Sequence, residues 1–286
     1  MLEILWSVIK LFLILVIIIS LLHGIVTHFI LWFELRLKSL QGELPDNIPL
    51  FTIMKSFFIE CFCNIARFFL SPFQLLSHKP SDSSNSSGVP ILLVHGYLQN
   101  QTDWLWFKHR LQTISHIGPI YSFNLNSPFD SIAKYAEKLK EEISDIKAET
   151  KQDKIILIGH SMGGLVCGYY TEFLAKPGEV AKVITLGSPF QGTRLAALGY
   201  GENVKEMSPH SSFLQDLTSR IQQSSITYHY VASQIDNMII PWQAAFPPHN
   251  TLAGNHKLIL EDHGHLRLLI SPQVVRQVAH WVLEAA

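Results

Sequence analysis

Charge is sparse in this sequence, and that sparsity limits what the chain can bind. Of its 286 residues, 16% are Asp, Glu, Lys or Arg, and the formal net charge is -1. There is no basic excess to indicate a nucleic-acid partner and no acidic tail to indicate a disordered chain. The length suits one or two domains with a large core. Overall hydropathy is high for a water-soluble enzyme, so the excess must be concentrated in one part of the chain.

Cysteine is also scarce. The three cysteines Cys61, Cys63 and Cys167 cannot build a disulfide framework, and two residues of separation keep the first pair off a common helix face. We expect free, partly buried thiols. The sequence has 14 histidines, but no H-x-x-x-H pattern and no Cys/His grouping predicts a metal site, so no cofactor is expected. His95, His109, His116 and His160 are interpreted as structural.

Charge is missing altogether from Leu11 to Phe33. As a helix this run would span about 34 Å, slightly more than the ~30 Å hydrocarbon core of a bilayer. Trp6 and Trp32 lie near its ends, where amphipathic rings favour the membrane interface. A buried core helix would usually be shorter and carry a polar stripe, and the following residues offer no small-x-small site for cleavage of a signal peptide. The run therefore predicts a single-pass N-terminal membrane anchor.

The charges that flank this run only weakly indicate its orientation. Lys10 precedes it, while Arg36 and Lys38 follow it, which slightly favours a cytoplasmic catalytic part. One extra charge leaves the side of the membrane open. In a bacterium, the membrane would be the inner, cytoplasmic one.

A second apolar stretch, residues 50–73, has a regular polar pattern. Its polar residues recur at steps of 4, 4, 3 and 4, which places them on one helical stripe: Ser56, Glu60, Asn64, Arg67 and Ser71. Phenylalanines cover the rest, and two charges argue against a second span. The pattern predicts either a helix in the membrane interface or a helix docked on the catalytic domain, and both alternatives stay open.

Domain boundaries follow from these patterns. Residues 1–36 form the anchor and its flanks, and residues 37–76 the amphipathic, interfacial segment. The Ser-rich residues 77–88 read as a flexible linker, and residues 89–286 as the catalytic domain. Within that domain, residues 189–225 are a possible lid or cap over an acyl chain. Six apolar residues of this segment either line such a lid or are ordinary helix core, namely Leu195, Leu198, Met207, Phe213, Leu214 and Leu217.

From residue 89 the chain alternates between short apolar runs and amphipathic segments. The apolar runs predict strands, namely "VPILLVHG", "IYSFNLN", "KIILIG", "AKVITLG", "ITYHYVAS" and "HKLILE". The segments between and after them predict helices, including one opened by Asp130 or Ser131 and a last one with Pro272 in its first turn. Such alternation is typical of an α/β fold with a mostly parallel sheet covered by helices on both faces. Sites in such sheets form at the carboxyl ends of the strands.

The pattern Gly159-His160-Ser161-Met162-Gly163 is the first sign of chemistry. G-x-S-x-G arises by chance in about one chain in ten of this length, so alone it is weak. Here a predicted strand leads directly in and a predicted helix leads directly out, as a nucleophile elbow requires. The two glycines leave room for a tight, strained turn. Ser161 is therefore the candidate nucleophile.

A serine hydroxyl needs a base, and the base needs a third group to orient it. Asp236 follows the strand "ITYHYVAS", and His265 lies between the last strand and the last helix, so the order Ser161, Asp236, His265 is that of a hydrolase triad. His263 is the competing histidine, but His265 stands between Gly264 and the apolar "LRLLI". Asp262 and Asp216 are competing carboxylates in less suitable places, and Asp236 capping a turn is the remaining alternative.

A tetrahedral intermediate also needs two hydrogen-bond donors for its oxyanion. One expected donor is the backbone N–H of Met162, directly after the serine. The other is the N–H of Tyr97, in the loop after the first strand, where Gly96 lets the backbone turn close to the site.

Together these segments resemble the α/β-hydrolase superfamily, and more narrowly the small bacterial triacylglycerol lipases and lipase-like esterases. The resemblance covers residues 89–286 and rests on "VHGY", "GHSMGG", "VITLGSPFQGT", "MSPHSSFLQDL", "DNMIIP" and "GHLRLL". It implies serine esterase chemistry on acyl esters, with Ser161, Asp236 and His265 as the triad and Tyr97 and Met162 as the oxyanion hole. The small secreted lipases lack the membrane helix and tether, so a secreted role does not carry over.

The sequence therefore predicts a membrane-anchored serine hydrolase that cleaves carboxylic esters of lipids. Its partners would be the acyl-ester substrate and the bilayer, with no nucleic acid and no deducible protein partner. Acyl transfer or thioester cleavage on the same triad is the alternative within enzymes. A catalytically inactive, membrane-tethered binding module is the alternative of another class. Substrate head group, chain length and oligomeric state are left open.

Overall fold

The computed structural model describes residues 1–42, 48–75, 88–248 and 256–284. The Ser-rich linker predicted for residues 77–88 lies outside these residues, except for its last position.

The centre of the molecule is a six-stranded sheet, which confirms the predicted fold class. In chain order its strands are β1 (Ile91–Val94), β2 (Ile120–Phe123), β3 (Ile155–His160), β4 (Val180–Leu186), β5 (Thr227–Ser233) and β6 (His256–Leu260). They lie in the order β2-β1-β3-β4-β5-β6, and every neighbouring pair is parallel. β1 and β3 are buried along their whole length, as expected of strands covered on both sides.

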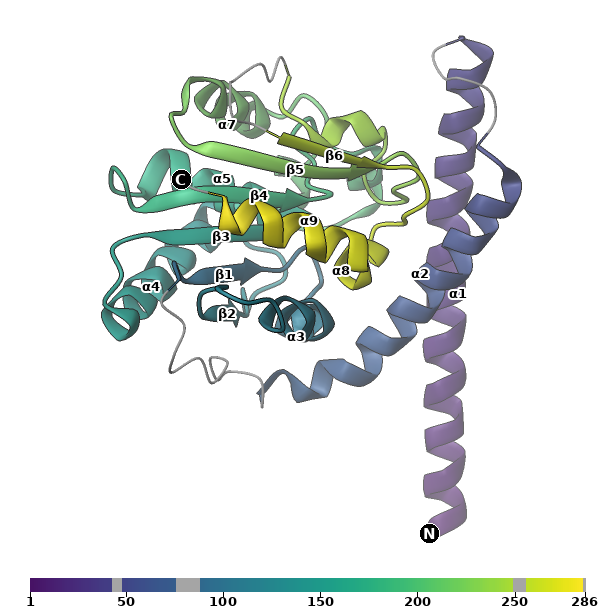
Figure 1. Ribbon diagram of the computed structural model, residues 1–286. Coiled ribbons are helices and arrows are strands. Elements are labelled where there is room, and N and C mark those ends of the chain that lie inside the picture. Colours follow the sequence, from purple (N-terminus) through teal and green to yellow (C-terminus); the bar gives the residue numbers. More distant parts are fainter. Residues whose placement is uncertain (43–47, 76–87, 249–255, 285–286) are drawn as a thin grey trace.

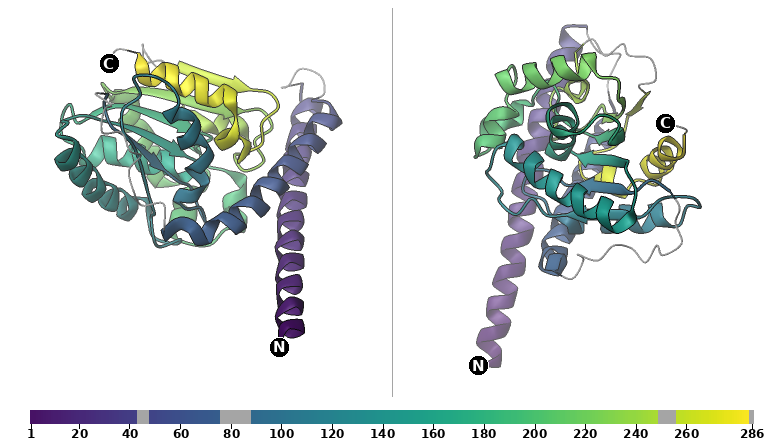
Figure 2. Two further views of the ribbon diagram at one scale, coloured as in Figure 1. Left: turned by 60° about the horizontal axis from the view of Figure 1, so that its bottom comes forward. Right: turned by 90° about the vertical axis from the view of Figure 1, so that its left-hand side faces the viewer.

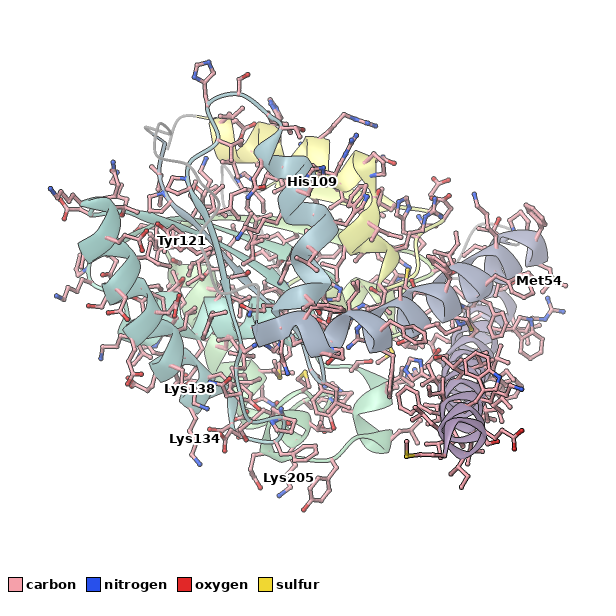
Figure 3. All side chains as sticks on the ribbon, turned by 90° about the horizontal axis from the view of Figure 1, so that it is seen from below. Met54, His109, Tyr121, Lys134, Lys138 and Lys205 are labelled. Atoms are coloured by element: carbon pink, nitrogen blue, oxygen red, sulfur yellow. The ribbon has the colours of Figure 1, made fainter. Side chains whose placement is uncertain are left out.

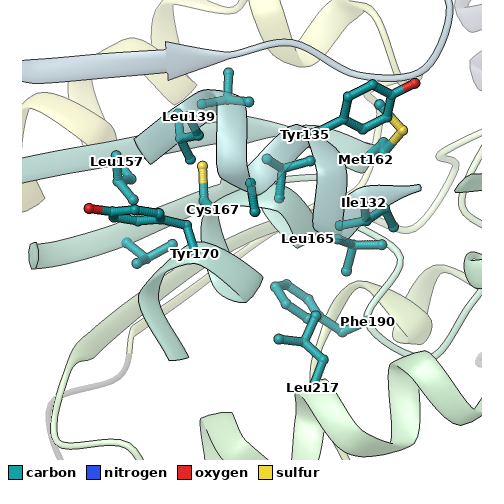
Figure 4. Close-up of a cluster of buried hydrophobic side chains, with 14 of the residues drawn as sticks. Ile132, Tyr135, Leu139, Leu157, Met162, Leu165, Cys167, Tyr170, Phe190 and Leu217 are labelled. Atoms are coloured by element: carbon teal, nitrogen blue, oxygen red, sulfur yellow. The ribbon is translucent and has the colours of Figure 1, made fainter. Parts of the chain in front are cut away.

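Helices cover both faces of this sheet (Figure 1, Figure 2). The helices are α1 (Leu2–Leu40), α2 (Leu50–Leu70), α3 (Leu105–Gln112), α4 (Ile132–Thr150), α5 (Met162–Tyr169), α6 (Glu202–Glu206), α7 (Ser212–Gln223), α8 (Arg267–Ile270) and α9 (Pro272–Leu283). α4, α5 and α7 share the hydrophobic core of one face, while α3 and α9 pack on the other. Figure 4 shows Cys167 of α5 beside Leu139 of α4, and Leu165 of α5 beside Ile132 of α4, in the first of these cores. Burial raises the pKa of the Cys167 thiol and leaves it without a reactive role.

Local signals in the sequence set the helix ends. α4 begins after Ser131, whose hydroxyl oxygen accepts a hydrogen bond from the Lys134 N–H. α9 begins after Ser271, whose hydroxyl caps the Val274 N–H, with Pro272 at the first position. Of the two predicted caps of α4, the structure uses Ser131.

α1 is too long to fit within a bilayer core. Its 39 residues extend about 58 Å, nearly twice the ~30 Å hydrocarbon thickness. The N-terminal half projects beyond the catalytic domain, and the C-terminal half lies beside it (Figure 1). Among the described residues, α1 is the one helix long and apolar enough to cross a membrane, and only 11% of its most apolar window is buried. A core helix would be mostly buried; a signal sequence near the N-terminus would share these features.

α2 lies against α1 and the catalytic domain with its polar stripe facing inward. Ser56 and Glu60 are buried, whereas the side chains of Phe58 and Phe62 are 61% and 68% exposed. Figure 3 shows Met54 at the outer end of this helix, away from the lysines Lys134 and Lys138 of α4. The two alternatives predicted for this segment, docking on the catalytic domain and lying in a membrane interface, therefore concern different faces. One face of α2 packs on protein, and the opposite, apolar face is exposed.

Candidate active site

Ser161 occupies a sharp turn between β3 and α5. Its φ of +57° and ψ of -128° lie outside the ordinary regions for a residue with a side chain. Its N–H donates to the Leu186 carbonyl of β4 at 2.9 Å, which holds the turn against the sheet. Strain of this kind is what a nucleophile elbow stores, because it lifts the serine hydroxyl out of the backbone.

Asp236 and His265 meet at the carboxyl ends of the strands. Asp236 follows β5 and His265 follows β6, and the Asp236 Oδ2 lies 2.9 Å from the His265 Nδ1. Both side chains are buried. The other carboxylate oxygen, Oδ1, accepts hydrogen bonds from the N–H groups of Met238 and Ile239 at 2.8 and 2.9 Å. With Oδ1 fixed in this way, Oδ2 points at the imidazole and favours the tautomer with its proton on Nδ1.

The residue before Ser161, His160, contacts His265. The rings of His160 and His265 lie 4.5 Å apart between centroids, and the His160 Nε2 is 3.2 Å from the His265 carbonyl oxygen. Burial and the neighbouring His265 hold the pKa of His160 well below its ordinary value. His160 is therefore neutral and packs against His265, which agrees with the structural role expected for it.

The loop after β1 lies against the serine. A β carbon added at Gly96 would stand 2.7 Å from the Ser161 Cβ, so only glycine allows this approach. His95 holds the loop: its Nδ1 donates to the Gly96 carbonyl at 2.9 Å and its Nε2 accepts from the Leu125 N–H at 3.1 Å. Burial lowers the pKa of His95 to about 4, which keeps this neutral pairing in place.

Tyr97 and Met162, the expected oxyanion donors, flank this contact. Within the described residues, neither backbone N–H donates a hydrogen bond to another protein group. Two free N–H groups on either side of a serine are what an oxyanion would bind. This arrangement can activate a hydroxyl and stabilise a tetrahedral anion.

The competing residues are engaged elsewhere. The His263 Nδ1 lies 2.7 Å from Asp262, and its Nε2 lies 2.8 Å from the Ser271 hydroxyl that caps α9. Asp216 is exposed on α7. Neither of the two rejected carboxylates contacts His265 among the described residues.

The two N-terminal helices also contact the site, which the sequence did not indicate. The Thr27 hydroxyl of α1 accepts a hydrogen bond from the Asn237 side chain at 3.0 Å, directly beside Asp236. Glu60 of α2 accepts from the N–H groups of Leu266 and Arg267 at 3.0 and 2.9 Å, directly after His265. The polar stripe of α2 was the available signal, but no pattern in the sequence named its targets.

The segment predicted as a lid contributes mostly to the core. Of the six apolar residues named as lid candidates, four are buried, namely Leu195, Met207, Leu214 and Leu217, while Phe213 is half-buried and Leu198 is exposed. Its exposed part, around Tyr200, contacts the loop after β1, because the Tyr97 hydroxyl donates to the Tyr200 carbonyl at 2.8 Å. That contact connects the segment to the loop that carries Tyr97.

One group of side chains elsewhere has metal-ligand chemistry. Donor atoms of His229, His256 and Glu284 lie within 4.8 Å of one another. The two imidazoles are stacked at 5.1 Å with 29° between their planes, so their lone pairs run nearly parallel instead of converging on one ion. Lys182, whose ammonium donates to the Glu284 carbonyl, adds positive charge. The group lies near the first residues of β5 and β6, away from the strand ends that carry Asp236 and His265.

Comparisons with known proteins find relatives in sequence and in fold. Residues 89–209 match the family model of the alpha/beta hydrolase fold. A triacylglycerol lipase of Pseudarthrobacter phenanthrenivorans is 31% identical over 123 residues, which cover 41% of this chain and 38% of the lipase. A rat 1-acylglycerol-3-phosphate O-acyltransferase, ABHD5, is 30% identical over 107 residues, 35% of this chain and 29% of that protein. The matched segment thus spans about a third of these relatives.

Among solved structures, the mature form of the Bacillus licheniformis lipase BlEst2 superimposes with a TM-score of 0.60. The superposition covers 72% of this chain and 96% of the lipase at 15% identity. It shows the fold alone. By its sheet, its family-model match and its relatives, the chain is a protein of the α/β-hydrolase fold that resembles bacterial triacylglycerol lipases.

Proposed function

We propose that this chain is a membrane-anchored serine hydrolase that cleaves carboxylic esters of lipids. The observation that carries the proposal is the buried Asp236–His265 pair, held at 2.9 Å and joined by His160, the residue before the strained Ser161, through the His265 carbonyl. The lipase relatives supply the substrate class, an acyl ester.

In the proposed mechanism, the His265 Nε2 takes the proton of the Ser161 hydroxyl as the oxygen attacks the ester carbonyl carbon. The Tyr97 and Met162 N–H groups bind the resulting oxyanion, and Asp236 stabilises the imidazolium. Collapse of the intermediate breaks the ester C–O bond, and His265 gives its proton to the leaving alcohol. Water then attacks the acyl-serine with His265 again as base, which releases the carboxylic acid and restores Ser161.

The anchor in this proposal is the N-terminal part of α1, with the open face of α2 on the lipid surface. The exposed face of α2 carries large apolar side chains, namely Phe51, Met54, Phe58, Phe62, Phe68 and Phe69. It continues from the exposed apolar side of α1, which it joins at the Phe12–Phe68 ring contact of 5.8 Å. The catalytic unit, residues 89–286, then sits beside the bilayer with the site facing the two helices. Glu34 of α1, buried and paired with Arg194, supports retention of α1 over its removal as a signal sequence.

The test uses the full chain in detergent, a fluorophosphonate probe and p-nitrophenyl esters of graded chain length. We expect the wild-type protein to label and to hydrolyse the esters, and Ser161→Ala to do neither. A wild-type protein that does neither, or a Ser161→Ala variant that keeps both, would refute the triad. Intact mass of the protein recovered from membranes tests the anchor: a species that lacks residues 1–40 would show cleavage instead.

A second function, acyl transfer, is favoured by the similarity to the rat acyltransferase. The same acyl-serine would be attacked by an alcohol in place of water, so the residues do not distinguish the two. Product analysis with an added lysophospholipid does: transesterified lipid in excess over free fatty acid would favour transfer, and fatty acid alone would favour hydrolysis.

A further inference from the structure

The segment that carries His265 is held by side chains from other parts of the chain. Three consecutive N–H groups, those of His265, Leu266 and Arg267, all donate to side-chain oxygens. The first donates to the Asn237 Oδ1, and Asn237 in turn donates to Thr27 of α1. The other two donate to Glu60 of α2. Both N-terminal helices are therefore connected to the backbone of the candidate base.

Glu60 makes the more direct of these connections. Its side chain is 1% exposed, and each carboxylate oxygen accepts one of the two N–H groups. The backbone makes room for it at Gly264, where an added β carbon would lie 2.5 Å from the Glu60 Oε1. The glycine before His265 is thus explained by the approach of a carboxylate from a helix far away in the sequence.

A fully buried carboxylate is unusual, because burying its charge costs free energy unless hydrogen bonds compensate. Removing it from water is costly, and the described residues place no Lys or Arg side chain against it. Gln or Asn could cap a single N–H at lower cost. In Glu60 each of the two oxygens accepts one of the two adjacent N–H groups, so the carboxylate fixes the direction of the backbone and not only its position.

On this basis, and resting on the proposed serine hydrolase, we propose that Glu60 is a positioning residue. Its carboxylate orients the backbone after His265 so that the imidazole faces Ser161, and it thereby connects the lipid-facing helix α2 to the catalytic base. The opposite side of the same helix turn presents Phe58 and Phe62 outward. A shift of α2 on the lipid surface would therefore move the His265 segment.

The charged state of Glu60 follows from its surroundings. Burial raises the pKa of this carboxyl to about 7, against the lowering effect of its two N–H donors. His265 and Asp236 face it from the catalytic domain, Cys61 and Cys63 flank it on α2, and the Arg267 guanidinium is turned away toward Asp262. From α1, His23 and His28 lie near the adjoining turns of α2. Protonation would replace one acceptor with a donor, so the ionised form is the one that holds both N–H groups.

If Glu60 must be ionised for catalysis, the pH dependence of kcat/KM will differ from that expected if Glu60 were purely structural. With two ionisations required, His265 neutral and Glu60 charged, the acid limb of log kcat/KM against pH has a limiting slope of about 2. In Glu60→Gln, which cannot ionise and keeps one acceptor oxygen, the slope falls to about 1. Above pH 8 the variant should be about 10- to 100-fold slower in kcat with KM for a short soluble ester little changed, because misplacement of about 1 Å costs up to about 100-fold.

The experiment measures pH profiles of the wild-type protein, Glu60→Gln and Ser56→Ala in detergent. Ser56→Ala is the matched control, since Ser56 lies one turn earlier on the same buried stripe and contacts His28 of α1, not the His265 segment. Each variant is first checked for thermal unfolding, and rates are expressed per mole of protein in the folded fraction. Should Glu60→Gln fail to fold, Glu60→Asp, which keeps the charge but is too short to reach both donors, replaces it.

The outcomes separate this proposal from the proposed function. A lower kcat with a slope near 1 in Glu60→Gln, with Ser56→Ala like wild type, supports positioning. For Glu60→Asp, which still ionises, the supporting result is a lower kcat with little change in KM. A Glu60 variant with wild-type kcat and slope overturns it while leaving the hydrolase intact. A wild-type protein that neither labels nor hydrolyses esters overturns the proposed function itself, whatever Glu60 does.

Discussion

Replacing Asp236 by Asn tests the proposed triad at the residue whose hydrogen bonds fix the tautomer of His265. Asp236 binds on two sides: Oδ1 accepts from two backbone N–H groups, and Oδ2 faces the His265 Nδ1. In the Asp236→Asn variant only one side-chain oxygen remains at this position. It will stay with the two N–H donors, because the reversed amide would set an NH2 group against them and leave two buried donors unpaired, at about 1–3 kcal/mol each.

The amide NH2 must then point at His265. A ring nitrogen that faces a donor has to accept, so the proton moves to Nε2, the atom that should take the Ser161 proton. The base is then present, buried and in the wrong tautomer. The corresponding change in a serine protease triad lowers kcat by about 10⁴-fold, equivalent to about 5.5 kcal/mol. We expect a loss of about 10³- to 10⁴-fold here, since the same fixed oxygen enforces the same tautomer.

The assay is kcat on p-nitrophenyl butyrate at pH 8, with the rate of fluorophosphonate labelling as a second measure. Asp262→Asn is the matched control, because Asp262 also contacts a histidine, His263, but lies outside the proposed triad. We expect it to retain activity within about threefold. An Asp236→Asn protein that folds and keeps activity within tenfold of wild type would refute the assignment, as would a larger loss in Asp262→Asn than in Asp236→Asn.

Three further predictions concern the N-terminal helices. Burial raises the pKa of Glu60 to about 7 in the folded protein, against a value near 4.5 in the unfolded chain. The protonated side chain therefore contributes stability that is fully present below pH 4.5 and is lost as pH rises through 7. Between pH 5 and 8 the unfolding free energy of the wild type should fall by about 3 kcal/mol relative to that of Glu60→Gln, measured by thermal unfolding. Arg194→Met should lower the unfolding free energy by about 1–2 kcal/mol, because it leaves the buried Glu34 with only the more distant Lys38 at 3.9 Å; an unchanged melting temperature would contradict this. Phe58→Ser combined with Phe62→Ser should leave hydrolysis of soluble esters unchanged and lower hydrolysis of lipid vesicles several-fold. A double variant that hydrolyses both substrates at the wild-type rate would exclude α2 from the lipid surface.

The catalytic fold was predictable because its signals are local. Each strand is a short apolar run between polar turns, and Ser131 and Ser271 mark helix starts through hydroxyl caps that act within three residues. The meeting of Asp236 and His265 was predictable for a related reason, since parallel strands bring their carboxyl ends to one edge. The contacts of Glu60 and Thr27 were not, because they join positions about 200 residues apart and depend on how two helices dock.

The direction of α2 shows why periodicity alone was insufficient. A polar stripe on an apolar helix usually faces water, and an isolated helix would lie with Glu60 toward solvent. Here the partner surface offers backbone donors after His265 and a carboxylate, Asp103, whose Oδ1 accepts from the Arg67 Nε at 3.0 Å. Arg67 also donates to the Leu98 carbonyl, next to Tyr97, the proposed oxyanion donor. The polar side chains of α2 therefore have better partners in protein than in water, and the phenylalanines are left to face outward. The contacts from α2 to the His265 segment and to the loop that carries Tyr97 therefore also leave an apolar outer face on this helix. That exposed apolar face is why we propose a lipid surface beside this site.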